Sequence, residues 1–291
     1  MTSHKSRYRN ALEIVVLSIL LLAGYALFQR LTGSSAVLLE SNLQSNLARI
    51  SRYLNASKVD TVLVGSSMTG RLLPSYFKGE GMNISNLGLD GCHAPFGLEI
   101  VLMRKDLPKR VLVETASLDH DPNANEKTVR EAIQTPTFKS GRAVEAFRPE
   151  NRPLSLLYWW CKQLSDRKPG GSSHPAFIND QQIADPTSES SKSELMGNDE
   201  AIEEILITLK KRGVDVRLFS IPHADGWGVP QSGRIVKISK DVGIPILEPG
   251  VEISKRTDTL RFTDGAHLDV ASAKLVSQEI ARMLRSQPRN P

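Results

Sequence analysis

The sequence predicts an α/β domain built on a central parallel five-stranded sheet, preceded by a membrane-spanning helix. Short apolar stretches alternate with amphipathic ones after residue 55, most of the apolar stretches end near Gly or Pro, and one long apolar run lies near the N-terminus. Nearly continuous apolar strands that alternate with helices are typical of a parallel sheet covered on both faces. The hydrophobic content of 40% and charged content of 24% are ordinary for a globular protein, which excludes collagen-like, coiled-coil and wholly disordered chains.

The N-terminal apolar run, residues 11–28, is interrupted only by Glu13 and Ser18. Eighteen helical residues span about 27 Å, close to the roughly 30 Å hydrocarbon core of a bilayer. Basic side chains lie in residues 1–10, which predicts a cytoplasmic tail there and the rest of the chain beyond the cytoplasmic membrane. We therefore expect a single-pass protein with its N-terminus inside.

A cleaved signal peptide is the alternative to this anchor. The Gly-Tyr-Ala sequence at residues 24–26 is a weak small-residue cleavage site. Leu27 and Phe28 continue the apolar run past that site, which favours an uncleaved anchor. Both alternatives export the remaining chain.

The elements after the anchor follow in a regular order. Residues 36–54 place apolar side chains three and four positions apart, which predicts a juxtamembrane helix. Apolar, β-rich stretches predict five strands, at residues 59–65, 82–87, 110–115, 214–221 and 244–247. Further helices are predicted at residues 96–104, 199–211, 234–241 and 270–284. Right-handed crossovers would bring the loops that follow the strands to one edge of the sheet, where ligands bind in such folds.

Residues 122–198 interrupt this alternation within a domain predicted to cover residues 55–291. They contain Tyr-Trp-Trp at 158–160, Lys-Pro-Gly-Gly-Ser-Ser at 168–173 and a Ser-rich run at 188–193. This composition indicates an insertion with a partly helical middle and a flexible second half. The insertion could be a lid, a partner surface or a poorly ordered surface excursion.

Charge and cysteine content exclude several classes of function. Most of the net charge of +5 comes from the first 30 residues, so the main body has no basic face large enough to suggest a nucleic-acid partner. Two cysteines exclude a disulfide-rich scaffold and a four-cysteine zinc site. Cys92 and Cys161 could form one disulfide after export or remain two separate buried thiols. The histidines show no metal-like spacing, so we expect no metal and no cofactor.

Three polar side chains form a candidate catalytic constellation. Ser67 follows the first strand in a turn of small residues, while Asp264 and His267 lie three residues apart before the last helix. A serine hydroxyl becomes nucleophilic when a histidine accepts its proton, and a carboxylate on the other ring nitrogen orients that histidine. The predicted sheet would bring Ser67 to the same edge as the other two residues.

These stretches resemble the sequence blocks of the SGNH/GDSL hydrolase superfamily. The first block reads Gly-Ser-Ser-Met-Thr at 65–69, the second Asn-Leu-Gly-Leu-Asp-Gly at 86–91 and the last Asp-Gly-Ala-His at 264–267. The resemblance implies a flavodoxin-like three-layer α/β/α fold with Ser67 as nucleophile, His267 as base and Asp264 as its partner. It also implies an oxyanion hole formed by the backbone N–H groups of Ser67 and Gly91.

The third block of that family departs from the pattern. Members usually carry an Asn after the third strand whose side chain donates to the oxyanion, and this chain has Leu118 at that position. Either Ser117 or His120 substitutes for the missing donor, or the oxyanion hole is weaker. Similar departures occur in membrane-anchored relatives, including proteins of alginate O-acetylation and teichoic-acid D-alanylation.

The expected function is therefore that of a membrane-anchored serine esterase or O-acyltransferase. Its substrate would be an acyl ester of a surface polysaccharide or peptidoglycan, with a possible acyl-handling membrane protein as partner. His223 follows the fourth strand and is, with Ser117 and His120, a possible substrate contact. The alternative is a catalytically inactive SGNH-like protein that binds polymer or assembles a polysaccharide-modification complex.

Overall fold

The computed structural model describes residues 2–32, 39, 41–77, 82–118, 124–166, 191–222, 231–254, 260–264 and 266–286. The chain divides into two compact units. One unit holds the sheet and comprises Arg52–Glu131 and Ala176–Pro291. The other comprises Met1–Ser51 and Ala132–Pro175 and is helical in its described part.

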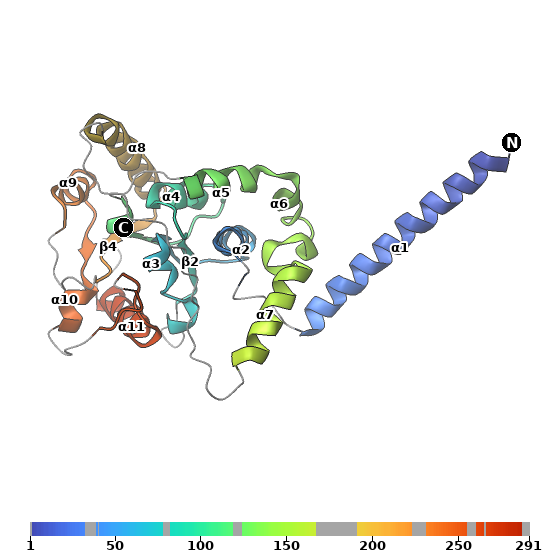
Figure 1. The fold of residues 1–291 in the computed structure, drawn as a ribbon. Coiled ribbons are helices and arrows are strands. Elements are labelled where there is room, and N and C mark those ends of the chain that lie inside the picture. Colours follow the sequence, from blue (N-terminus) through green and yellow to red (C-terminus); the bar gives the residue numbers. More distant parts are fainter. Residues whose placement is uncertain are drawn as a thin grey trace. The chain divides into compact units, whose positions relative to one another are not determined.

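The sheet unit has five parallel strands in the order β2-β1-β3-β4-β5. Figure 1 labels β2 and β4 of this sheet. The strands are β1 (Thr61–Gly65), β2 (Ile84–Gly88), β3 (Arg110–Glu114), β4 (Asp215–Phe219) and β5 (Ile246–Leu247). The predicted α/β class with an all-parallel sheet is therefore confirmed. Each strand lies within two residues of its predicted position, because apolar β-rich stretches bounded by Gly and Pro mark buried parallel strands well.

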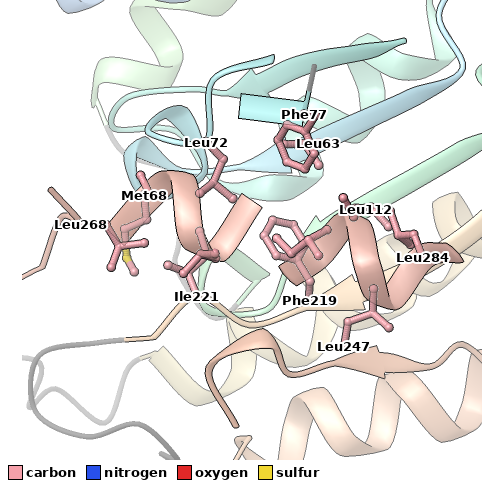
Figure 2. Packing of buried hydrophobic residues seen from close by; sticks show 14 of the residues in the cluster. Leu63, Met68, Leu72, Phe77, Leu112, Phe219, Ile221, Leu247, Leu268 and Leu284 are labelled. Atoms are coloured by element: carbon pink, nitrogen blue, oxygen red, sulfur yellow. The ribbon is translucent and has the colours of Figure 1, made fainter. Parts of the chain in front are cut away.

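One face of the sheet packs against the last helix, α11 (Val270–Ser286). Leu63, Leu112 and Phe219 come from three neighbouring strands and form one core cluster with Val276 and Ile280 of α11. Figure 2 shows the strand side chains of this cluster together with Leu284 from the end of the same helix. The alternation of side chains along a strand sends the other apolar set to the opposite face.

The opposite face is in contact with α4 (Ala94–Leu102). Gly97 of this helix lies so close to β1 that a Cβ atom there would come within 2.6 Å of the Val64 side chain. The unit also contains five shorter or more peripheral helical elements and two single-turn 3₁₀ segments in its described residues. These are α3 (Ser67–Gly70), α5 (Ala124–Gln134), α8 (Ser191–Lys211), α9 (Gly233–Val242), α10 (Pro249–Ser254), η1 (Pro74–Phe77) and η2 (Ala116–Leu118).

The helical unit begins with α1 (Thr2–Thr32), within which residues 8–29 are long and apolar enough to cross a membrane. The helix α2 (Asn42–Asn55) covers the later part of the helix predicted at residues 36–54, of which residues 36–38 and 40 lie outside the described residues. At its start the Ser41 hydroxyl accepts a hydrogen bond from Gln44 N and the Ser41 carbonyl one from Ser45 N. The remaining helical elements are α6 (Pro136–Ser140), η3 (Glu145–Phe147), η4 (Pro149–Asn151) and α7 (Pro153–Asp166).

The stretch predicted as an insertion, residues 122–198, is largely helical where it is described. It contains α5, α6, α7 and the first turns of α8, while residues 167–190 lie outside the described residues. Helix α8 begins at Ser191, within the Ser-rich run, eight residues before the predicted helix at 199–211. The apolar period is clear only after Asp199, so the sequence pattern marks the packed part of α8 and not its start.

Close packing of β2 on α3 generates the first prediction. A Cβ atom at Gly88 would lie 2.2 Å from the backbone N of Gly70 and 2.6 Å from the carbonyl carbon of Thr69. Backbone cannot rotate away, so we expect Gly88→Ala to lower the free energy of unfolding by about 1–3 kcal/mol or more, as measured by urea denaturation. Gly233→Ala is the control, because nothing lies within 4 Å of its added Cβ. An unchanged stability for Gly88→Ala would mean that β2 and α3 are not in contact.

Candidate active site

The predicted nucleophile lies at the first turn of a short helix. Strand β1 ends at Gly65, Ser66 has extended backbone, and Ser67 begins α3. The Ser66 hydroxyl accepts a hydrogen bond from Met68 N, so Ser66 caps the helix while the Ser67 side chain remains free to face the opposite loop. Polar caps of this kind satisfy the unpaired N–H groups at a helix start.

A buried carboxylate that sequence reasoning missed holds this turn in place. Glu114 is the last residue of β3 and is fully buried. It accepts hydrogen bonds from Ser66 N (2.8 Å), Thr69 Oγ1 (2.6 Å) and Ser66 Oγ (3.0 Å). Gly65 leaves room for it, because a Cβ there would lie 2.3 Å from Glu114 Oε2. In the sequence, the only sign of this role is that Glu114 ends an otherwise apolar strand at the edge where ligands bind.

The loop that carries His267 is closed by short-range hydrogen bonds. Thr263 N donates to the His267 carbonyl (2.8 Å), Asp269 N donates to the Arg261 carbonyl (2.9 Å), and residues 262 and 268 form an antiparallel bridge. Asp264 Oδ1 accepts from His267 N at 2.8 Å, and Asp264 Oδ2 lies 2.7 Å from His267 Nδ1. The carboxylate therefore fixes both the backbone and the imidazole of His267.

The structure brings the three predicted catalytic side chains together. Ser67 Oγ lies 2.8 Å from His267 Nε2, although 200 residues separate them in the chain. A carboxylate accepts hydrogen bonds only, so in the neutral imidazole Nδ1 carries the proton toward Asp264 and Nε2 is left to accept from the serine hydroxyl. This arrangement can remove a proton from Ser67 as its oxygen attacks an electrophile.

The burial of two apolar neighbours in one core cluster supports the same arrangement. Met68 and Leu268, the chain neighbours of Ser67 and His267, both belong to the core cluster formed with α11. Figure 2 labels Met68 and Leu268 among the side chains of this cluster. Burial of the two neighbours therefore draws the nucleophile turn and the histidine loop toward one another.

The loop after β2, which carries the predicted oxyanion donor Gly91, lies next to the nucleophile turn. Gly65 and Gly88 are register partners, and Leu89 N donates to the Gly65 carbonyl at 2.8 Å. Gly91 has φ of 66°, which favours glycine. Its N–H, like that of Ser67, donates to no other atom among the described residues.

Two further side chains fix this loop. Asn86 Nδ2 donates to the carbonyls of Thr69 (2.7 Å) and Leu72 (2.8 Å), which ties β2 to α3. His93, two residues after Gly91, is buried and pairs through its backbone and Nδ1 with buried Glu126. Burial works to raise the pKa of Glu126, but hydrogen bonds from His93 and then from Arg130 lower the pKa below its ordinary value.

The possible substrate contacts have different outcomes. Ser117 is fully buried, and its hydroxyl donates to the Glu114 carbonyl at 2.9 Å, so it stabilises the turn after β3. Leu118 is also buried and offers no side-chain donor. His120 and His223 lie outside the described residues.

The structure also describes both cysteines and potential metal ligands. Cys92 and Cys161 are both free thiols; Cys92 is buried and Cys161 is exposed, which corrects the expectation that both would be buried. Among the described residues, no group of three His, Cys, Asp or Glu side chains could hold a metal ion.

The role of Glu114 generates the second prediction. Glu114→Gln would replace one carboxylate oxygen with an NH₂ group, which cannot accept the hydrogen bonds that Ser66 and Thr69 donate. We therefore expect the free energy of unfolding to fall by about 1–3 kcal/mol in urea denaturation. Glu131→Gln is the matched control, because Glu131 is an exposed carboxylate on α5. Equal stability of the two variants would contradict the positioning role.

The environment of Asp264 generates the third prediction. Partial burial works to raise the pKa of Asp264, but hydrogen bonds from the His267 backbone and imidazole and from Ala266 N lower the pKa below its ordinary value of 3.8. A carboxyl whose pKa is lower in the folded state stabilises that state above the unfolded pKa, and this stabilisation is lost as pH falls through the folded pKa.

We therefore expect His267→Ala to raise the pKa of Asp264, measured by carbon-detected NMR titration of its carboxyl group. The pKa of Asp269, which is lowered by hydrogen bonds from Ser272, should not change and serves as the internal control. An Asp264 titration that is the same with and without the imidazole would show that the pair does not form.

Comparison with family models and with curated proteins identifies no relative of this chain: no family model matches it, and no curated protein does. The functional conclusion therefore depends on the arrangement of the residues themselves.

Proposed function

We propose that the chain is a membrane-anchored SGNH-type serine esterase or O-acyltransferase. The observation that carries the proposal is the continuous hydrogen-bonded series Ser67–His267–Asp264, with distances of 2.8 and 2.7 Å. The series lies at the carboxyl edge of a parallel sheet, where α/β proteins bind their ligands. A serine, an imidazole and a carboxylate in this order are the arrangement that acyl transfer through a serine needs.

The mechanism follows from the roles that the atoms can take. Ser67 Oγ attacks the acyl carbonyl while His267 Nε2 accepts the serine proton, and Asp264 stabilises the imidazolium that forms. The N–H groups of Ser67 and Gly91 receive the negative charge that develops on the carbonyl oxygen. His267 then returns the proton to the leaving alkoxide, and acyl-Ser67 passes its acyl group to water or to a sugar hydroxyl.

The three-layer α/β/α arrangement of SGNH proteins is part of the proposal. It is supported by the strand order β2-β1-β3-β4-β5, by α11 against one face of the sheet, and by the contact between Gly97 of α4 and Val64 on the other face. The order of the motifs also agrees, since nucleophile, glycine-rich turn and Asp-x-x-His follow one another in this order along the chain.

A retained anchor is favoured over a cleaved signal peptide. Tyr25 donates its hydroxyl proton to the Asn151 carbonyl at 2.5 Å, and Gln29 Nε2 donates to the same oxygen at 2.6 Å. Cleavage after Ala26 would remove Tyr25 and with it one of these bonds. The basic residues before the span predict that the N-terminus stays in the cytoplasm and that the site lies outside the membrane.

The substrate class follows from location and chemistry together. A serine acyl-transfer site beyond the cytoplasmic membrane meets acyl esters on surface polysaccharides or peptidoglycan, and an anchored transferase would receive its acyl group from a membrane partner. Leu118 favours a second candidate, a binding or assembly protein with the same fold, because it removes a side-chain donor whose loss costs roughly 10²–10³ in rate.

The fourth prediction separates these two candidates. A fluorophosphonate probe should label the full chain in membranes, and labelling should disappear in Ser67→Ala and His267→Ala. Turnover of an acetyl ester should fall by about 10⁴-fold or more in each variant. Ser75→Ala is the matched control, because Ser75 is an exposed serine in η1 outside the constellation.

Thermal unfolding of each variant must accompany the labelling. Folded variants without labelling support the enzyme. A folded wild-type chain that never labels and cleaves no acetyl ester would refute the enzyme and favour the binding protein.

A further inference from the structure

Helix α7 has one face that packs inside its own unit. Ser155 is fully buried and its hydroxyl donates to the Pro149 carbonyl at 3.2 Å. Leu156 packs against buried Leu39 and Ala48, the latter on α2. These contacts fix which side of α7 faces inward.

The opposite face of α7 is apolar and exposed. Leu154, Leu157 and Trp160 have 62%, 56% and 58% of their surface exposed, and Cys161 is exposed beside them. Positions 154, 157 and 161 lie on one side of a helix of 3.6 residues per turn, with 160 at its margin. Residues 153–161 contain no Lys, Arg, Asp or Glu. A helix that faces water normally carries charged or polar side chains on its outer face. The outer face of α7 is apolar instead.

Hydrogen bonds link the start of α7 to the end of the proposed span. Tyr25 and Gln29 lie at the C-terminal end of the apolar segment of α1, and both donate to the carbonyl of buried Asn151, two residues before α7. Arg152 Nη1 donates to Gln44 Oε1 at 2.9 Å, which holds the same junction against α2. Figure 1 shows the C-terminal end of α1 beside the segment that leads into α7.

These links set the depth at which α7 begins. If α1 crosses the bilayer, as the proposed function holds, Tyr25 and Gln29 lie at the outer boundary of the hydrocarbon, because the apolar segment ends there. Asn151 is then at the same level, and the first turn of α7 starts at the membrane surface. Trp and Leu side chains at that level are stabilised by the boundary between headgroups and acyl chains.

We propose that α7 is an interfacial membrane helix that inserts Leu154, Leu157 and Trp160 into the outer leaflet. The occupant of its apolar face is lipid, because α7 begins two residues after Asn151, whose carbonyl accepts hydrogen bonds from the end of the proposed span, and because residues 153–161 carry no charge. This inference rests on the anchor of the proposed function and is independent of the catalytic role of Ser67. The helix thereby gives its unit a second contact with the membrane.

The native thiol of Cys161 allows a direct test, because it is exposed on this face while Cys92 is buried. The full chain is reconstituted into liposomes and labelled at Cys161 with a polarity-sensitive fluorophore; Cys161→Ser verifies the labelling site. Lipids that carry a nitroxide near the headgroup should quench most of the emission, whereas aqueous iodide should quench little of it. Leu157→Glu combined with Trp160→Glu should reverse the two results, and Thr137→Glu, an exposed polar position of α6, should leave them unchanged.

The same sample distinguishes failure of α7 from failure of the anchor. Resistance to extraction by alkaline carbonate reports α1, and quenching at Cys161 reports α7. If carbonate extracts the chain while lipid nitroxides still quench the label at Cys161, the anchor is refuted and the interfacial helix is retained. A label open to iodide would overturn the proposal, as would a label shielded from both quenchers, since a second copy or a protein partner would then cover the face.

Discussion

The hydrogen bond between Ser67 Oγ and His267 Nε2 is the interaction on which the functional account depends. The two residues are 200 positions apart in the chain, so the fold of the sheet unit must bring them together. Strand β1 delivers Ser67 and helix α11 follows directly after His267, so their separation is set by the packing of that helix on the sheet. Burial of Met68 and Leu268 in one core cluster links this packing to the polar contact above it (Figure 2).

Further polar groups hold Ser67 and His267 in position. Glu114 accepts three hydrogen bonds from the nucleophile turn, and Asn86 bonds the backbone of α3. Asp264 holds both the backbone and the ring of His267. Buried polar groups are expensive unless they are fully paired. The buried and paired Glu114 and Asn86 therefore stabilise the turn that carries Ser67.

The parallel sheet and the three catalytic candidates could be predicted from the sequence, because apolar strands, glycine-rich turns and a closely spaced Asp and His leave local patterns. The only local signal of Glu114 is its place at the end of an apolar strand, and its role arises only when β3 lies beside β1 and the carboxylate reaches Ser66. The position of Ser117 in a motif does not reveal that the folded chain buries it, with its hydroxyl bonded to the Glu114 carbonyl. The exposed face of α7 could not be identified from the sequence, because the spacing of apolar residues does not show that Leu156 faces inward.

A structure of the full chain after reaction with a phosphonate ester tests the central claim most directly, because the adduct mimics the tetrahedral intermediate at the same atoms. The account predicts phosphorus bonded to Ser67 Oγ, His267 still paired with Asp264, and one phosphoryl oxygen about 2.7–3.1 Å from the N–H groups of Ser67 and Gly91. An unmodified Ser67 in a folded protein, or an adduct whose phosphoryl oxygen points away from both N–H groups, would contradict it.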